Sequence, residues 1–189
     1  MVLAMRVPYL SFVLFAMVTT PVLSQLKSPE VDADGRVTFR LLAPQAKSVS
    51  VKGIGDMPLT LTLTDRKKGI WEVITEPLAP EIYEYTFDVD GTMMIDPHNR
   101  LVKKWRVLAS MVEVSGKEPA VYAWQSVPHG ALVSHRYISS ATGTERGVVV
   151  YTPPGYAKLE KRYPVVYLLH GFGDDEGAWH ENGRAHVII

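Results

Sequence analysis

The chain has 189 residues, of which 47% are hydrophobic, and its 20 Lys and Arg balance its 20 Asp and Glu to a formal net charge of zero. This balance argues against a basic surface for nucleic acid or anionic lipid, and the apolar content indicates a packed globule. The sequence contains no cysteine, so its stability has to come from the burial of apolar groups and not from disulfides.

The first 24 residues have the pattern of a secretory signal peptide. Arg6 supplies a positive start, residues 7–18 are apolar apart from Ser11, and a Thr-Thr-Pro break precedes Val22-Leu23-Ser24. The apolar run is shorter than the ~20 residues that a membrane-spanning helix needs. We therefore expect cleavage after Ser24, a secreted or periplasmic product and no membrane association after cleavage.

Residues 28–115 have the pattern of an antiparallel β-sandwich, with short alternating segments between turn residues. Residues 59–64 alternate Leu and Thr without a break, which predicts one strand. Asp34-Gly35 and Asp90-Gly91 fit tight hairpin turns, and Lys68-Gly69 is a weaker turn signal. The alternation assigns these side chains to buried faces: Val37, Phe39, Leu41, Tyr83, Tyr85, Phe87 and Val89.

A linker at residues 116–130, mixed in Pro, Gly and aromatic residues, separates this sandwich from a second region, residues 131–189. Residues 132–139 and 147–151 predict a strand pair joined by the polar turn 140–144. Residues 164–169 form a continuous apolar run, which predicts a strand buried on both faces of an α/β sheet. Residues 184–189 predict the start of a helix.

The apolar run ends in His170-Gly171-Phe172-Gly173, and a buried strand followed by His-Gly-x-Gly resembles the third strand and oxyanion loop of the α/β-hydrolases. The resemblance implies that the Phe172 N–H faces the substrate carbonyl, with Gly171 and Gly173 shaping the turn. Backbone donors of this kind lower the barrier to ester cleavage by roughly 3–4 kcal/mol. His170 is then a residue that supports the loop.

The wider pattern is more specific. Residues 150–156 and 163–171, with Trp179 and Gly183-Arg184-Ala185, resemble the esterase D / feruloyl-esterase-like carbohydrate esterases. Residues 69–73, 83–91 and 95–97 resemble the immunoglobulin-like early-set domain at the front of isoamylases, branching enzymes and many such esterases. Together they imply a mainly β chain, an immunoglobulin-like β-sandwich followed by the truncated start of an α/β-hydrolase domain.

The family's nucleophile lies in Gly-x-Ser-x-Gly, and this sequence contains no such motif. Because the triad histidine follows the serine in that family, His170 is not the catalytic base. We expect the chain to be the N-terminal portion of an exported serine carboxylesterase that is inactive alone. The resemblance implies an acylated carbohydrate or small ester as substrate, for example a feruloyl or acetyl ester, and no cofactor.

The aromatic residues leave a second interpretation of the chain open. Trp71, Tyr83 and Tyr85 form a sugar-stacking platform or fill the sandwich core, and Trp179 lines a substrate pocket or packs the loop. In the first case the chain is a non-catalytic glycan-binding or scaffolding module. A third interpretation, the front domain of an amylase-type enzyme, is disfavoured because such enzymes continue into a (β/α)₈ barrel.

No metal site is expected. His180 and His186 are six residues apart, whereas a zinc helix places two histidines four apart on one face. Asp174-Asp175-Glu176 precedes a predicted helix, where acids cap free N–H groups more often than they bind calcium.

Overall fold

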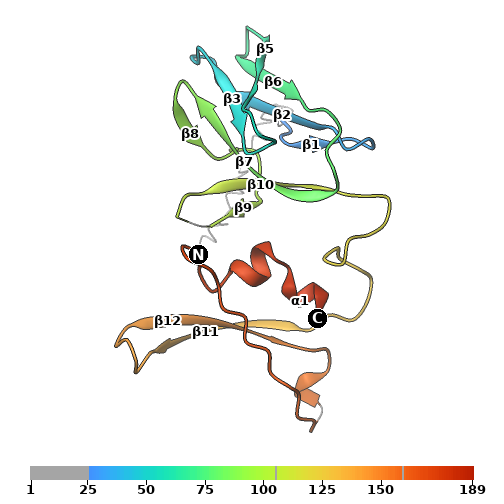
Figure 1. Ribbon diagram of the computed structural model, residues 1–189, viewed down its shortest axis with the longest axis vertical. Helices are drawn as coiled ribbons and strands as arrows, with labels where there is room; N and C mark the ends of the chain where they lie inside the picture. Colours follow the sequence, from blue (N-terminus) through green and yellow to red (C-terminus); the bar gives the residue numbers. More distant parts are fainter. Residues whose placement is uncertain (1–25, 105, 159) are drawn as a thin grey trace, which may run out of the picture.

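The computed structural model describes residues 26–104, 106–158 and 160–189, so the predicted signal peptide at residues 1–24 lies outside the described residues. Two antiparallel sheets form a sandwich, and a separate two-stranded sheet follows it in the chain (Figure 1). No helix among the residues described here has the length and apolar character needed to cross a membrane.

The first sheet of the sandwich has the strand order β1-β2-β6-β5, and the second has the order β4-β3-β7-β10-β9, with β8 also paired to β7. The first comprises β1 (Glu30–Val31), β2 (Val37–Leu42), β5 (Thr62–Asp65) and β6 (Ile70–Ile74). The second comprises β3 (Val49–Lys52), β4 (Leu59–Thr60), β7 (Glu81–Val89), β8 (Thr92–Met94), β9 (Val102–Lys103) and β10 (Ala109–Val114). This architecture confirms the mainly β prediction.

The core lies between the two sheets and follows the predicted alternation. Phe39 of β2 and Phe87 of β7 are fully buried, and the ring of Tyr85 lies 4.6 Å from that of Phe39 between centroids. Every second residue of a strand points to the same face, so each sheet presents one apolar face to the other. The predicted set of buried side chains is confirmed, with Tyr83 and Val89 partly buried at its margin.

The stretch at residues 59–64 is not one strand, as predicted, but two. β4 pairs with β3 in the second sheet, and β5 pairs with β6 in the first. Leu61 lies between them, 2% exposed, and its N–H donates to the Val49 carbonyl at 2.8 Å. The alternation of buried Leu with exposed Thr continues through the crossing, which is why sequence periodicity alone did not reveal it.

The predicted hairpin turns are confirmed. Asp90 and Gly91, between β7 and β8, have φ angles of 50° and 89°, as a turn with two left-handed residues requires. The Asp90 carboxylate also accepts the N–H groups of Lys47 at 3.0 Å and Ser48 at 2.7 Å. These two backbone hydrogen bonds lower the pKa of Asp90 and fix the turn against the start of β3.

A buried polar network closes one end of the core. Asp96 is 0% exposed, and its carboxylate accepts the hydroxyls of Ser28 at 2.6 Å and Tyr85 at 2.8 Å. Asn99 donates to the Tyr85 hydroxyl at 3.0 Å, and Ser110 accepts the Asp96 N–H at 2.8 Å. The network ties the chain before β1, through Asp96 and Asn99 of the loop between β8 and β9, to β7 and β10.

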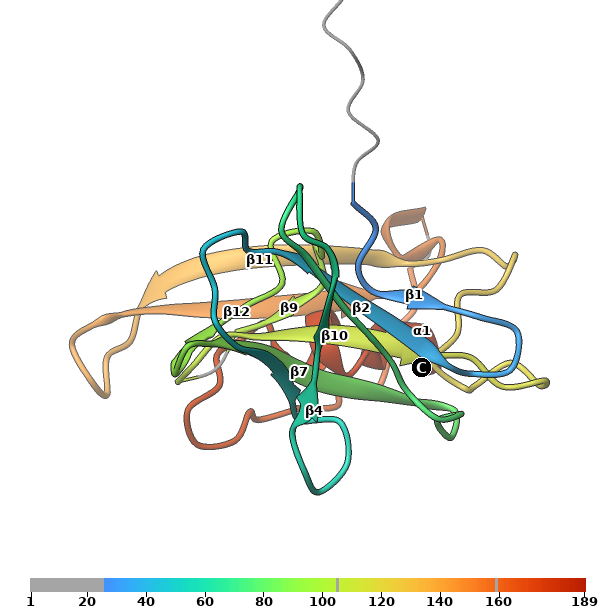
Figure 2. The same cartoon turned by 90° about the horizontal axis from the view of Figure 1, so that it is seen from above.

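The second region begins with an antiparallel hairpin, as predicted. Its strands are β11 (Ala131–Ile138) and β12 (Glu145–Thr152), and the Ser139 N–H donates to the Thr144 carbonyl across the turn. The 3-10 helix η1 (Tyr156–Lys158), the π-helix η2 (Ala178–Asn182) and the α-helix α1 (Ala185–Ile188) follow. The last two lie between β9–β10 of the sandwich and the hairpin (Figures 1 and 2).

The predicted buried strand at residues 164–169 is wrong in this structure. The segment has no strand hydrogen bonding, and its side chains are exposed, with Val165 at 70% and Leu169 at 85%. A strand needs a neighbour to satisfy its backbone groups, and none of the strands among the described residues pairs with this segment. The apolar side chains of this segment therefore suit a buried strand, but the segment has no strand partner among the described residues.

Candidate functional site

The candidate oxyanion loop, residues 170–173, links the extended segment 164–169 to η2. The Asp174 N–H donates to the Gly171 carbonyl at 3.2 Å, and Gly173 has a φ of 90°, so the main chain makes a tight turn. The Nδ1 of His170 lies 2.9 Å from the Gly171 carbonyl oxygen. His170 thus contacts the backbone of the next residue, and its supporting role stays a prediction.

Trp179 ties η2 to the residue just before this loop. Its indole N–H donates to the Leu169 carbonyl at 3.0 Å, and the side chain remains 45% exposed. Asp175 accepts the Gly177 N–H at 2.8 Å in a local turn just before η2, but no side chain caps η2, so the capping role predicted for this acidic run is wrong in this structure. A cavity of about 190 Å³ lies beside the loop, lined in part by His170, Gly171 and Trp179.

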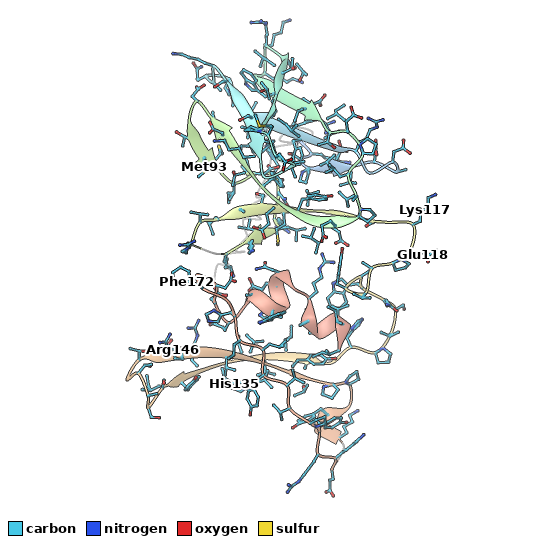
Figure 3. The ribbon with its side chains drawn as sticks, in the orientation of Figure 1. Met93, Lys117, Glu118, His135, Arg146 and Phe172 are labelled. Carbon is cyan, nitrogen blue, oxygen red and sulfur yellow. The ribbon has the colours of Figure 1, made fainter. Side chains whose placement is uncertain are left out.

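The sandwich supplies the opposite side of this region. Lys103 of β9 lines this cavity beside the loop, which is the smaller of two cavities described here, together with the loop residues. The guanidinium of Arg106 lies 5.0 Å from the ring centroid of Phe172, a cation–π distance. Figure 3 shows Phe172 on the side of the second region that faces the sandwich. The candidate oxyanion loop therefore contacts the front domain through Arg106, while the Phe172 side chain stays 85% exposed.

Two ion pairs join η2 and the start of α1 to the sandwich. Lys104 Nζ lies 3.0 Å from a carboxylate oxygen of Glu181, and an Arg184 nitrogen lies 2.7 Å from Glu113 of β10. The Arg184 and Glu113 side chains are only 19% and 26% exposed. Because partial burial reduces solvent screening, this second pair holds the two parts together more firmly than an exposed pair would.

A larger cavity of about 250 Å³ lies at the same interface. Its sandwich wall contains Ile82, Leu101 and Met111, and its other wall contains Trp124, Asn182 and His186. Sequence reasoning did not single out Trp124 or Asn182, since a linker tryptophan and an asparagine at the end of a short helix carry no local signal. Asn182 lines both cavities, so the two are neighbours.

The structure does not bring the other aromatic sequence candidates to either cavity. Trp71 is 8% exposed, belongs to the core, and donates its indole N–H to the Ala43 carbonyl at 2.9 Å. This burial corrects the interpretation of Trp71 as a sugar platform, because no open ring face remains. Tyr83 packs against the core margin and donates its hydroxyl to the Ala79 carbonyl at 2.9 Å.

The histidines of this region belong to an aromatic cluster. The His186 ring centroid lies 5.6 Å from that of Trp124 and 6.3 Å from that of His180. Burial lowers the pKa of His186, and the charges of His180, His129 and Arg184 lower it further. Across the ranges that the structure describes, no group of three or more His, Asp or Glu side chains is placed to hold a metal ion.

Comparison with known families gives two matches that follow one another along the chain. Residues 28–119 match carbohydrate-binding module 48, the isoamylase N-terminal domain, which has an immunoglobulin-like fold. Residues 139–189 match the Esterase family. The second match covers β12, the candidate oxyanion loop and the helices η2 and α1.

A curated relative joins both parts in one protein. The endo-1,4-beta-xylanase/feruloyl esterase of Xylanibacter ruminicola is 36% identical over 171 residues, which are 85% of this chain and 23% of the relative. Among solved structures, the enterochelin esterase of Shigella flexneri is 15% identical, with a TM-score of 0.47 over 64% of this chain and 41% of its own. The pullulanase of Bacillus acidopullulyticus is 22% identical, with a TM-score of 0.37 over 45% of this chain and 11% of its own. The front part of the chain, residues 28–119, is thus similar to carbohydrate-binding module 48, a domain of immunoglobulin-like fold, and residues 139–189 are similar to the Esterase family.

Proposed function

We propose that the chain is the N-terminal portion of an exported serine carboxylesterase that cleaves feruloyl or acetyl esters of carbohydrate. The observation that carries the proposal is the position of the candidate oxyanion loop, residues 170–173, in a segment similar to esterases and in contact with a domain similar to a carbohydrate-binding module. The name of the curated relative, a xylanase and feruloyl esterase, supports the same class of substrate.

The chemistry of the proposal assigns a separate task to each part. A serine attacks the ester carbonyl, and the resulting oxyanion needs preorganised N–H donors in a site that excludes water. The Phe172 N–H supplies one donor, and His170, whose ring contacts the Gly171 carbonyl, supports the loop. The 189 residues contain no Gly-x-Ser-x-Gly, so the nucleophile is not among them, and we expect this polypeptide to show no serine-dependent turnover.

The test compares this polypeptide with one extended through the downstream coding sequence, using p-nitrophenyl acetate and methyl ferulate. We expect turnover only from the extended form. In that form, Phe172→Pro removes the N–H and should lower kcat by roughly 10²–10³, the cost of one oxyanion donor. Phe172→Leu keeps the N–H and is the matched control. Turnover by the 189-residue polypeptide, or equal activity of the two variants, would contradict the assignment.

Export is tested separately. Fractionation of the native host should find the protein outside the cytoplasm with a mature N-terminus at Gln25, the residue after the predicted cleavage point. Recovery of a cytoplasmic protein with an intact residue 1–24 segment would remove this part of the proposal.

A second candidate function is favoured by the match of residues 28–119 to a carbohydrate-binding module. In that case the chain is a non-catalytic module that binds or scaffolds glycan. Retention on arabinoxylan or starch, together with no ester turnover by the extended form, would select this function over the first.

A further inference from the structure

The sequence motif Gly183-Arg184-Ala185 has no task in the proposed chemistry, and the backbone of its arginine is unusual. Arg184, between η2 and α1, has φ and ψ angles of 48° and 32°, in the left-handed region. A side chain crowds the main chain in this region, so residues other than glycine rarely adopt it. Gly183, which could adopt it freely, has a φ of −79° instead. Such a conformation persists only where the surrounding structure holds it, so the contacts of Arg184 have to supply that hold.

Two groups from other parts of the chain hold the Arg184 side chain. Its Nη2 donates to a carboxylate oxygen of Glu113 in β10 at 2.7 Å, and its Cζ lies 5.7 Å from the ring centroid of Tyr122 in the linker. The Arg184 and Glu113 side chains are mostly buried, which leaves little solvent to screen their charges. A guanidinium that is bonded to a carboxylate and placed over an aromatic ring has its direction fixed by both. Arg184 therefore joins β10, the linker and the last helices.

The helix before Arg184 leads back to the candidate oxyanion loop. The Gly183 N–H donates to the Ala178 carbonyl at 3.1 Å, which closes the end of η2 next to Arg184. A Cβ on Gly183 would lie 3.1 Å from the Trp179 carbonyl oxygen, so this end of η2 is tightly packed. Trp179 in turn donates its indole N–H to the carbonyl of Leu169, the residue directly before the loop. A shift of Arg184 relative to β10 would therefore move Trp179 and the start of the loop.

We infer that Arg184 is a positioning residue of the proposed esterase, and that its contacts with Glu113 and Tyr122 let the front domain set the position of the candidate oxyanion loop. The inference rests on the proposed function and deepens it. Arg184 does not line the cavity beside the loop, so it acts through η2 and Trp179. A displacement of reacting groups by about 1 Å can lower a rate roughly 10²-fold, so the loss of this anchor should reduce kcat. The front domain then contributes to the rate of the reaction as well as to its location.

The first measurement is amide hydrogen exchange of the 189-residue polypeptide, which requires no activity. The reporters are the N–H groups of Gly183 and Val187, which donate to carbonyls on either side of the anchor. Arg184→Gln and Glu113→Gln should each speed their exchange roughly tenfold or more, about the effect of losing one hydrogen bond between charged groups. Because both variants break the same contact, the double variant should exchange no faster than the quicker single one. Arg184→Lys keeps the charge but loses the planar donors, so its exchange should be intermediate.

The second measurement is the kinetics of methyl ferulate cleavage by the polypeptide extended through the downstream coding sequence. Arg184→Gln should lower kcat roughly 10–100-fold and leave KM nearly unchanged, because the change displaces the loop and not the groups that bind substrate. Arg184→Lys should recover part of kcat. A residue that only supported folding would instead lower Tm and the amount of folded enzyme, with kcat for each folded molecule unchanged.

Lys104→Gln is the matched control, because the Lys104–Glu181 pair crosses the same interface at 3.0 Å but its side chains are 59% and 39% exposed. Its effect on exchange and on kcat should not exceed about threefold. If Glu113→Gln disturbs β10, as a loss of dispersion in its NMR spectrum would show, Arg184→Gln decides together with Tyr122→Leu, which removes only the ring contact and should speed exchange about threefold. Unchanged exchange or unchanged kcat in Arg184→Gln, or an equally large effect of Lys104→Gln, would overturn the inference.

The two proposals fail in different ways. Ester turnover by the extended polypeptide with the same kcat in Arg184→Gln would overturn the positioning role alone. Exchange that depends on Arg184 and Glu113, with no ester turnover, would support the anchor and overturn the esterase.

Discussion

Removal of the Tyr85 hydroxyl should destabilise the sandwich far more than removal of the Tyr83 hydroxyl. Both tyrosines lie on β7 and on the same face, but Tyr85 is 1% exposed and donates to the buried Asp96 carboxylate at 2.8 Å. Burial raises the pKa of Tyr85, and the Asp96 charge raises it further, so the phenol stays protonated and donates at every ordinary pH. Tyr83 instead donates to a carbonyl in an exposed position.

The magnitude follows from the partners left behind. A hydrogen bond to a charged group contributes about 1.5–3 kcal/mol, so Tyr85→Phe should lower the free energy of unfolding by about 2 kcal/mol. The ring remains, and with it the contact with Phe39. Tyr83→Phe should cost about 0.5 kcal/mol, since its acceptor can bond to water.

The assay is urea denaturation followed by tryptophan fluorescence, with Trp71 as the buried reporter. Each kcal/mol should also shift Tm by roughly 4–8 °C in a domain of this size. Equal losses for the two variants, or a loss below 0.5 kcal/mol (about the error of such measurements) for Tyr85→Phe, would refute the account of the Asp96 network.

Three further predictions concern the turns, the interface and the second region. Gly53→Ala should destabilise the sandwich by more than about 2 kcal/mol, because Gly53 has a φ of 97° and a Cβ would lie 2.2 Å from the Glu84 carbonyl oxygen. Gly55→Ala is the control: Gly55 has a φ of 70° but open space around it, so the loss of stability should be only about 1 kcal/mol. Because the pKa of His186 is lowered in the folded chain, the unfolded chain takes up the proton first as pH falls below ~6.5, and the interface should lose stability there. Hydrogen exchange of residues 178–188 should show this loss in the unmodified chain and a smaller loss in His186→Gln. Limited proteolysis should cut the exposed segment 164–169 early and leave a core of roughly residues 27–115; equal protection of residues 131–189 would contradict this order.

The parts of the fold that depend on local pattern were predictable. Alternation placed Phe39, Tyr85 and Phe87 in the core, and Asp90-Gly91 marked a turn, because each signal arises from neighbours in the chain. Pairing is not local. The Leu-Thr alternation at residues 59–64 has the same period in either sheet, so it could not reveal where the chain changes from one to the other.

The site was predictable only where a motif carried it. His170-Gly171-Phe172-Gly173 identified the candidate loop, but nothing in the sequence around Trp124 or Asn182 indicates that sandwich residues face them. Composition predicted burial for residues 164–169, although burial depends on strands that lie elsewhere. Trp71 shows the reverse error, since an aromatic residue that suits a sugar equally suits a core.

The crossing at Leu61 makes one short stretch of backbone common to both layers of the sandwich. β4 cannot leave its place beside β3 without pulling on β5 beside β6. The strand pairing in one sheet therefore fixes the position of the chain in the other, and the two sheets have to form or separate together. A residue inserted between Thr60 and Thr62 would shift the alternation in one layer relative to the other and turn leucines outward. An insertion at residues 55–58, where the chain is mostly exposed, would lengthen a loop and leave both layers in register. Length variation in this domain should therefore be tolerated on one side of β4 and not on the other.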